Sequence, residues 1–238
     1  MASAYAVLHE IHARRTAMGW RRVGRKIGFT NRTLWERYGV DRPMWASVFA
    51  ETVQRAPTGR HTLSLSGLVQ PRIEPEVVFG LRGPVTNASS ARTALDAVEW
   101  IAAGFELVQC HFPNWRFRAP DCTAAFGLHG ALVVGQPKPL VDAERDRLAG
   151  VLAEFELSLF RDGSEVDRGR GSDVLGSPAL ALAALAQLLD TQPEAPRLRA
   201  GEIVTTGTLT DAWPIAAGAE WRADYGVLGL EPVTLRIA

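Results

Sequence analysis

The chain has 238 residues, of which 47% are hydrophobic and 22% are charged, and its 26 basic and 26 acidic residues give a formal net charge of +0. This length allows one large domain with a sizeable core, and the lack of a basic excess argues against nucleic acid as the main partner. No segment has the apolar length of a membrane span or of a signal peptide, so a cytoplasmic protein without membrane association is expected. Its two cysteines, Cys110 and Cys122, are then expected to be reduced thiols.

Helix and strand signals alternate in the first part of the chain. Residues 4–18 place apolar side chains at helical spacing and predict a helix. Residues 21–29 predict a strand whose glycines permit a close approach of the backbone to another group. Thr30 or Asn31 then caps a short predicted helix, and residues 39–43 have the composition of a turn.

The middle of the chain carries one long apolar strand signal, preceded by an ambiguous stretch at residues 44–66. Residues 73–81 predict the strand, although Pro75 restricts its first half to a sheet edge or a strand end. Residues 91–103 show helical spacing of apolar side chains and predict a helix. Residues 105–110 then predict another strand.

Short strands dominate the last part of the chain. Ser177 and Pro178 are typical of an N-cap and a first helical residue, and they begin a predicted helix that ends near Asp190. Strands are predicted at residues 130–135, 152–160, 202–206, 220–225 and 233–237. Because strands outnumber helices and do not alternate regularly with them, the expected fold class is α+β with a mixed or antiparallel roll.

A pair of glutamates marks the long strand as a candidate metal site. Glu74 and Glu76 are two residues apart, so a strand presents both carboxylates on one face. Adjacent carboxylates repel each other unless a positive charge lies between them, and a hard divalent cation prefers oxygen ligands. By itself the pair is more typical of two solvated glutamates. Glu106 favours the metal site, because it lies in an apolar strand where a buried charge needs a partner.

Five segments resemble motifs of the fumarylacetoacetate hydrolase superfamily, and within it those of the bacterial 2-oxopent-4-enoate hydratases and 4-oxalocrotonate decarboxylases. The segment PRIEPE at 71–76 is similar to the metal motif, and FELV at 105–108 is similar to the segment with the third ligand. The other segments are VGRKIGFT at 23–30, GVDRP at 39–43 and LRAGEIVTTGTLT at 198–210. The resemblance covers nearly the whole chain, and the five motifs in this order are specific together.

The resemblance implies a mixed β-roll of the fumarylacetoacetase C-terminal-domain type. Residues 66–238 would form this catalytic roll, and residues 1–65 a small N-terminal lobe with a helix, a strand and a candidate lid. It also implies Mg²⁺ or Mn²⁺ bound by Glu74, Glu76 and Glu106, with a 2-oxo acid substrate that chelates the metal. A cation on the keto oxygen stabilises the enolate of a decarboxylation, hydration or C–C cleavage. A homo-oligomer, or a complex with a related lyase, is implied as well.

Two positions depart from the family pattern. Met44 stands where the hydratases carry an acid–base aspartate and the decarboxylases an apolar residue, which favours decarboxylation. Residues 124–129, AAFGLH, replace the family's ADNASS segment beside the substrate. His129 could supply the missing polar group as a general base, since histidine titrates near neutrality. A structural histidine at the start of a strand is equally consistent with the sequence.

The motifs supply further site candidates. Lys26 is implied to lie near the metal as a second positive group or proton shuttle, and a desolvated lysine can have a lowered pKa. Asp121 is the remaining catalytic candidate, because the family also carries an aspartate in this register. The substrate-binding candidates are Arg72, Phe126, Thr206 and Thr208. Each candidate has an ordinary alternative: surface exposure or pairing for the charged residues, core packing for the phenylalanine and turn formation for the threonines.

The sequence therefore predicts a divalent-metal-dependent lyase for a short 2-oxo-enoate or related 2-oxo acid, with a slight preference for decarboxylation over hydration. The first alternative is an acylpyruvate-type hydrolase that cleaves a C–C bond on the same metal site. The second is a non-catalytic partner subunit of a hydratase/decarboxylase complex, because segments beside the substrate have changed.

Overall fold

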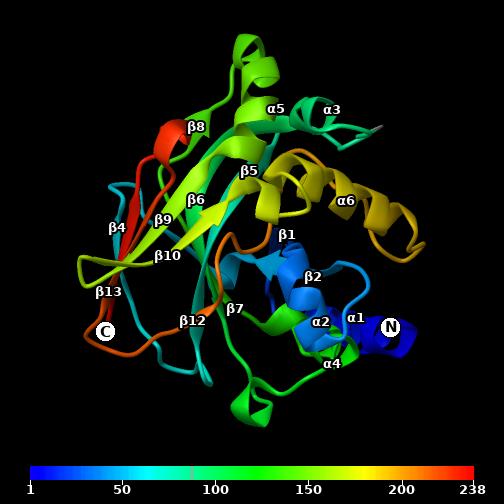
Figure 1. Cartoon of the computed structure of the whole chain (residues 1–238). Helices are drawn as coiled ribbons and strands as arrows, with labels where there is room; N and C mark the ends of the chain where they lie inside the picture. Colours follow the sequence, from blue (N-terminus) through cyan, green and yellow to red (C-terminus); the bar gives the residue numbers. More distant parts are fainter. Residues whose placement is uncertain (87) are drawn as a thin grey trace.

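Two β-sheets with helices packed around them make up the protein (Figure 1). The computed structural model describes residues 1–86 and 88–238. The strands in these ranges are β1 (Arg22–Gly28), β2 (Met44–Phe49), β3 (Val53–Arg55), β4 (Arg60–Leu63), β5 (Arg72–Leu81), β6 (Val98–Val108), β7 (His129–Val134), β8 (Lys138–Pro139), β9 (Glu156–Arg161), β10 (Ser164–Arg170), β11 (Ile203–Thr205), β12 (Trp213–Pro214), β13 (Glu220–Asp224) and β14 (Val233–Ile237). The α-helices are α1 (Ala2–Ala17), α2 (Trp35–Tyr38), α3 (Ala91–Leu95), α4 (Ala119–Ala124), α5 (Arg145–Glu154) and α6 (Pro178–Asp190).

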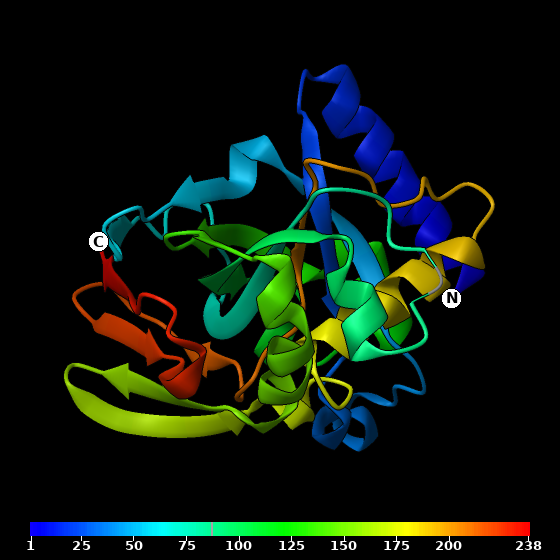
Figure 2. The same cartoon turned by 90° about the horizontal axis from the view of Figure 1, so that it is seen from above.

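The larger sheet has the order β2-β1-β11-β5-β6-β7-β3, with β12 paired to β5 and β8 paired to β6. The smaller sheet has the order β10-β9-β13-β14-β4. Parallel pairs join β1 to β11, β3 to β7 and β4 to β14, and the other pairs are antiparallel. In both views the smaller sheet and the C-terminus lie on one side, and α1, α6 and the N-terminus lie on the other (Figure 1 and Figure 2). The predicted mixed α+β roll is confirmed.

The paired strands β5 and β6 run through the middle of the larger sheet, and their apolar residues are buried on both faces. Pro75 lies inside this pair, opposite Phe105. Its carbonyl oxygen accepts a hydrogen bond from the Leu209 N–H at 3.1 Å, away from β6. In an extended strand the nitrogen and the carbonyl oxygen of one residue point to the same side, so the Pro75 nitrogen also points away from β6. Because β11 has already ended on that side, the missing N–H of proline removes no hydrogen bond between strands. Pro75 therefore lies within a central strand, at a point where that strand has no partner strand on one side.

Two predicted elements were wrong in type or length. The helix predicted at residues 91–103 ends at Leu95, and the central strand β6 begins at Val98. A strand buried on both faces has a continuous apolar run, which local periodicity does not separate from a buried helix. The strand predicted at residues 152–160 begins only at Glu156, because α5 occupies the residues before it.

The predicted terminal helices and caps are confirmed. In α1, Leu8 is fully buried and the Tyr5 ring stacks on Trp45 at 6.0 Å. The Asn31 side chain accepts a hydrogen bond from the Thr33 N–H at 3.0 Å, so Asn31 rather than Thr30 is the cap. The Ser177 side chain accepts from the Ala179 N–H and caps α6.

Segment 1–65 contributes strands to both sheets: β1, β2 and β3 belong to the larger one and β4 to the smaller one. The hydrogen-bond pattern therefore ties it to the rest of the chain, and the division at residue 65 stays a prediction. None of the described helices combines the length and the apolar character that a membrane-spanning helix needs.

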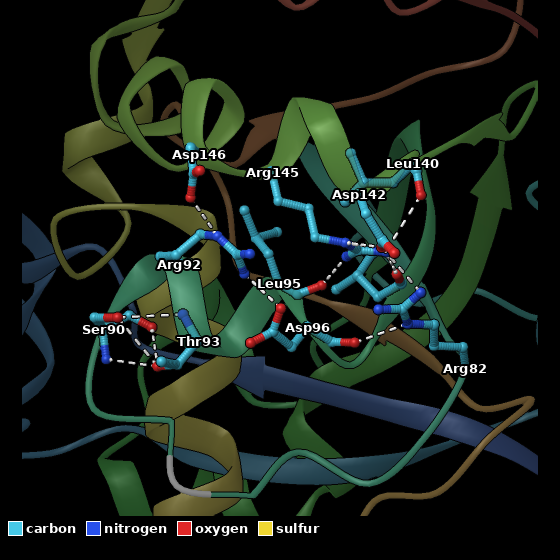
Figure 3. Close-up of polar contacts among 11 residues, drawn as sticks. Arg82, Ser90, Arg92, Thr93, Leu95, Asp96, Leu140, Asp142, Arg145 and Asp146 are labelled. Atoms are coloured by element: carbon cyan, nitrogen blue, oxygen red, sulfur yellow. Dashed lines mark hydrogen bonds and ion pairs between the residues drawn. The ribbon is translucent and has the colours of Figure 1, made fainter.

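A buried arginine, Arg145, connects the start of α5 to the chain around the start of β6 (Figure 3). The Arg145 guanidinium donates to the main-chain carbonyl oxygens of Leu95, Val98 and Leu140, and to the carboxylate of Asp142. Its distances to Val98 O and Leu140 O are 3.0 and 3.2 Å. Each of these carbonyls would otherwise be a buried acceptor without a donor, so this cluster is structural.

Candidate metal centre

The three glutamates predicted from the sequence meet on one face of the β5–β6 pair. Glu74 and Glu106 are direct partners in the antiparallel register, and Glu76 lies two residues further along β5. One oxygen of each carboxylate lies within 4.8 Å of the others. Like charges placed directly opposite each other destabilise a sheet, so this arrangement requires a compensating positive charge.

Part of that compensation comes from Lys26 on β1. Its Nζ donates to Glu106 Oε2 at 2.8 Å and to the Gly127 carbonyl at 3.0 Å. Burial opposes ionisation of Glu106, but the Lys26 charge and a hydrogen bond from His129 outweigh burial and lower the pKa of Glu106 to about 2. Glu106 is therefore an anionic oxygen donor across the physiological range.

The structure corrects the expected charge behaviour of Lys26. Burial by itself favours a neutral amine, as predicted, but the three neighbouring carboxylates outweigh burial and raise the pKa of Lys26. Lys26 is thus a permanent cation in the metal-free protein. It lines the cavity beside the carboxylates, which agrees with its predicted place as a second positive group.

His129 lies behind Glu106. Its Nδ1 is 2.7 Å from Glu106 Oε1 and its Nε2 is 2.8 Å from the Thr52 hydroxyl. A carboxylate only accepts, so Nδ1 carries the proton in this contact. The ring is buried and does not line the cavity. This corrects the general-base prediction: His129 orients a candidate metal ligand, as the partners of metal-binding carboxylates commonly do.

Glu76 is held by the turn after β11. Its Oε2 accepts from the Thr205 hydroxyl and, at 2.7 Å, from the Gly207 N–H. The Tyr225 hydroxyl lies 2.8 Å from the Glu76 carbonyl and 2.9 Å from the Gly104 carbonyl, which fixes the main chain of this pair. Gly207 has φ +100, and a Cβ there would overlap the Thr30 side chain, so a glycine is needed.

The electrostatics of the cluster fit a hard divalent cation. Burial, followed by the neighbouring carboxylates, raises the pKa of Glu76 well above its usual range. Burial also raises the pKa of Glu74 to about 7. Three carboxylates thus share one ammonium group, and no His nitrogen or Cys sulfur belongs to the donor set. Oxygen-only donors with excess negative charge are what Mg²⁺ and Mn²⁺ bind, so the residues fit the predicted metal.

A cavity opens in front of the carboxylates. Polar lining residues include Lys26, Glu74, Glu76, Arg72 and Thr208, of which the last two were predicted to bind substrate. The Thr208 hydroxyl already donates to the Thr210 carbonyl at 2.9 Å. Much of the remaining lining is apolar or aromatic, and its residues include Phe29, Met44, Val108, Trp115, Phe117 and Leu128. Met44 therefore lines the cavity, and it is the residue from which the sequence analysis predicted decarboxylation rather than hydration.

Three predicted site residues lie outside this cavity. Asp121 is exposed at the start of α4, where its carboxylate accepts from the Arg118 N–H at 2.9 Å, so it caps a helix instead of meeting the carboxylate cluster. Phe126 is a core residue that stacks on Phe49 at 5.8 Å. The Thr206 hydroxyl donates to the Val77 carbonyl at 2.9 Å and is fully buried. These positions correct the catalytic and substrate-binding roles predicted for them.

Thr30 is a site residue that the sequence analysis missed. It lines the cavity next to Gly207, it is 1% exposed, and its hydroxyl has no hydrogen-bond partner among the described residues. A buried hydroxyl without a partner is costly, so a ligand oxygen in the cavity is its natural partner. The only sequence signal was its place at the end of the VGRKIGFT segment, where it was considered as a helix cap.

Comparison with known families agrees with this geometry. The family model described as fumarylacetoacetate (FAA) hydrolase C-terminal matches residues 37–230. The "TodF product hydratase" of Pseudomonas putida is 32% identical over 241 aligned positions, which cover 100% of this chain and 84% of the hydratase. A 4-oxalocrotonate decarboxylase from a Pseudomonas species is 31% identical, over 91% of this chain and 80% of the decarboxylase.

Among solved structures, the chain is similar to the 4-oxalocrotonate decarboxylase of Pseudomonas putida in its complex with magnesium and adipate. The TM-score is 0.87 at 25% sequence identity, and the match covers 100% of this chain and 86% of that one. A hydratase and a decarboxylase are therefore almost equally similar in sequence, and overall identity does not choose between the two reactions.

Proposed function

The chain belongs to the fumarylacetoacetate hydrolase family, and on this basis we propose that it is a divalent-metal-dependent lyase for a short 2-oxo-enoate. Its relatives are named as hydratases and decarboxylases, and one similar structure is a decarboxylase with magnesium and adipate. The observation that carries the proposal is the convergence of three glutamate oxygens within 4.8 Å of one another, where Glu74 and Glu76 line a cavity and Glu106 is buried beside them.

Glu74, Glu76 and Glu106 are the proposed ligands of Mg²⁺ or Mn²⁺. When bound, the cation supplies Lewis acidity, which stabilises the negative charge that develops on the oxygen of a 2-oxo group during C–C cleavage or hydration. Other residues of the chain orient these carboxylates. His129 and Lys26 fix both oxygens of Glu106, and the Gly207 N–H fixes Glu76.

Lys26 and Thr30 are the proposed partners of the substrate oxygens. The Lys26 ammonium has one donor left after its bonds to Glu106 and Gly127, and it faces the cavity. The Thr30 hydroxyl lacks any partner among the residues that the structure describes. Both groups donate to oxygen, so they would bind the 2-oxo acid end of a substrate and strengthen their bonds as charge develops there.

We favour decarboxylation over hydration because of the apolar wall. Met44 is 1% exposed and lines the cavity beside Phe29 and Leu128, and its side chain has no titratable group that could activate water. An apolar wall instead destabilises a substrate carboxylate relative to neutral CO₂, since a charged group pays a larger desolvation penalty than a neutral one.

The reaction is tested with 2-oxohex-3-enedioate and 2-hydroxypenta-2,4-dienoate, each with Mg²⁺ and with a chelator, by following absorbance and released CO₂. Metal-dependent loss of the first substrate with release of CO₂ is the expected result. Metal-dependent loss of the second alone would identify a hydratase. Release of pyruvate and an acid from an acylpyruvate would identify a hydrolase, and no turnover of any substrate would contradict the enzyme proposal.

The protein is further proposed to work in the cytoplasm as a homo-oligomer. Cys110 and Cys122 are both buried free thiols, which suits a reducing compartment. The assembly state is measured by sedimentation of the purified chain, and a monomer at micromolar concentration would contradict the oligomer.

A further inference from the structure

A group of cations lies behind β1, on the face of the strand opposite the metal centre. Arg25 and Lys26 are neighbours on β1, so their side chains point to opposite faces. Lys26 reaches the glutamates, whereas Arg25 is fully buried on the other face, where it donates to Glu202 at 3.3 Å. The cation cluster, as we call it, consists of His12 and Arg15 on α1 and of Arg22 and Arg25 on β1.

One carboxylate serves three guanidiniums at this place. The Glu202 oxygens lie 3.3 Å from Arg22 Nη2, 3.3 Å from Arg25 Nη1 and 3.7 Å from Arg199 Nε. Charge-assisted bonds from an N–H to a carboxylate are usually about 2.7–2.9 Å long, so all three contacts are loose. In the part of the chain that the structure describes, none of these arginines has a second carboxylate partner, and an excess of positive charge remains.

Arg15 is held by aromatic rings instead of a carboxylate. Its Cζ lies 4.4 Å from the centre of the Phe126 ring, 4.9 Å from that of Trp20 and 5.6 Å from that of Phe49. Burial lowers the pKa of Arg15, and no carboxylate among the described residues opposes this effect. Stacking positions a guanidinium without consuming its N–H donors, so the donors that point away from the rings remain available.

His12 lies between these arginines. Its ring packs on Phe49 at 5.2 Å, and the guanidinium of Arg15 covers the same phenylalanine. Its Nδ1 is 3.0 Å from the Ser47 hydroxyl, and Ser47 is the direct partner of Arg25 in the register of β1 and β2. Because Nδ1 is already engaged with Ser47, the other ring nitrogen, Nε2, is the one that can bind a ligand.

The pKa values in the cluster show that its positive charges repel one another. Burial, followed by the charges of Arg22, Arg25, His9 and Arg15, lowers the pKa of His12 to about 4. Burial also lowers the pKa of Arg25 to about 10. These directions are the reverse of those at Glu74 and Glu76, where burial and neighbouring carboxylates raise the pKa. A bound anion would remove the repulsion here, as a cation would there.

A small oxyanion suits these donors. They come from both a helix and a strand, so the ligand must accept hydrogen bonds from several directions. A tetrahedral ion such as phosphate does this, and the planar fork of a guanidinium matches two of its oxygens at once. The cluster is open to solvent at Arg199, whose side chain is 67% exposed, and at Arg22, whose side chain is 14% exposed, so an ion can enter there.

We propose that the cation cluster binds a small inorganic oxyanion of the phosphate class, with Arg15, Arg22 and His12 as its donors and Arg25 as the buried positive charge behind them. Because two members of the cluster lie on α1 and two on β1, the bound ion would connect the N-terminal helix to the sheet. None of these residues takes part in the proposed lyase reaction, so the inference does not depend on that reaction.

The test uses His12 as a reporter in the full-length, chelator-treated chain, where phosphate cannot bind through a metal ion. NMR titration of the histidine rings is run in phosphate and in chloride at equal ionic strength. In phosphate the pKa of His12 should rise by at least about one unit, because an anion beside the ring favours its charged form. His61, on β4 of the smaller sheet, is the internal reference and should titrate alike in both salts. An unchanged His12 would overturn the proposal.

Two neighbouring arginines of α1 provide the matched pair of variants. Arg15→Gln should lose most of the phosphate-induced shift of His12. Arg14→Gln removes the same charge from the same helix, but Arg14 is exposed and paired with Glu10, so the shift should persist. An equal shift in both variants would mean a general effect of charge and would overturn the site.

Calorimetry is the second measurement, and it does not depend on Arg15→Gln being folded. The native chain should bind one phosphate, and Arg22→Gln should weaken this binding about tenfold, since a charge-assisted bond is lost. Arg14→Gln should bind phosphate as the native chain does. Phosphate binding that is unaffected by Arg22→Gln would place the ion elsewhere on the protein and would contradict the proposal.

Discussion

Two buried clusters of charge in this protein have opposite balances. Around Arg145, one guanidinium meets three main-chain carbonyls and the Asp142 carboxylate, so every acceptor has a donor (Figure 3). Around Glu106, three carboxylates share one ammonium group, and the pKa values of two of them are raised. The first cluster is complete without a ligand, whereas the second is not.

This difference distinguishes a charged cluster that stabilises the fold from a charged cluster that can bind a ligand. A satisfied buried ion is part of the structure, and removing it leaves orphaned acceptors. Carboxylates that the fold holds close together repel one another, and a bound cation removes that repulsion, so their arrangement favours cation binding. Substitutions in the first cluster should therefore change stability, and substitutions in the second should change binding.

The largest expected effect is on turnover in the carboxylate cluster. Glu106→Gln removes the anionic ligand whose pKa is about 2 and leaves Lys26 without its partner. We expect kcat/KM for the metal-dependent reaction to fall on the order of a thousandfold. Steady-state kinetics at saturating Mg²⁺ measure this, and activity within a factor of a few of the native protein would refute the ligand assignment.

The next effect is on stability in the arginine cluster. Arg145→Met leaves the carbonyls of Leu95, Val98 and Leu140 without donors. The free energy of unfolding should decrease by about 3 kcal/mol, as measured by urea denaturation. Metal affinity of the folded variant should stay at the native value, and a loss of both properties would show that the two clusters are not independent.

The third effect is a gain in stability, whereas most substitutions of partly buried residues reduce stability. The pKa of Glu74 is about 7 in the metal-free protein, above the value of about 4.3 for an exposed glutamate. The folded state therefore binds the proton more tightly, and the free energy of unfolding decreases as the pH rises from about 4.3 to about 7. Without metal, Glu74→Gln should be more stable than the native protein at pH 8 by an amount on the order of 3 kcal/mol.

That difference should vanish near pH 4, where both forms of residue 74 are neutral. The stabilisation by Glu106 has the opposite sign and is lost only as the pH falls towards about 2, and it is common to both proteins. Chelator-treated samples followed by urea denaturation across this range give the comparison. A variant that is less stable than the native protein at pH 8 would mean that Glu74 is not strained in the metal-free state.

The smallest effect concerns the unpartnered Thr30 hydroxyl. Thr30→Val keeps the shape of the side chain and removes a buried polar atom without a partner, so stability should stay the same or rise by up to about 1 kcal/mol. If the hydroxyl binds substrate, KM should increase about tenfold. Thr206→Val is the matched control, since it breaks an existing bond to Val77 and should lower stability without raising KM.

Most of the fold, and the meeting of the three glutamates proposed as metal ligands, could be predicted from the sequence, because motifs and periodicity are local signals. The spacing of Glu74 and Glu76 fixed their common face, and the apolar surroundings of Glu106 pointed to a buried partner. The helix at 91–103 was wrong because a strand buried on both faces has no strand period.

The remaining errors concern side-chain orientation. Whether His129 faces the cavity or lies behind Glu106 depends on how three strands pack, and no local pattern contains that information. The same applies to Asp121 and Phe126, which lie close in sequence to residues that line the cavity but point elsewhere. The lack of a hydrogen-bond partner for the Thr30 hydroxyl could be recognised only from the positions of its neighbours in the structure.

The most direct test of the account is a calorimetric titration of the chelator-treated protein with Mn²⁺. One ion should bind per chain, Glu76→Gln should weaken binding at least about a hundredfold, and Arg145→Met should bind as tightly as the native protein. Native affinity in Glu76→Gln, or no binding by the native protein, would contradict the claim that the three glutamates are held together for a divalent cation.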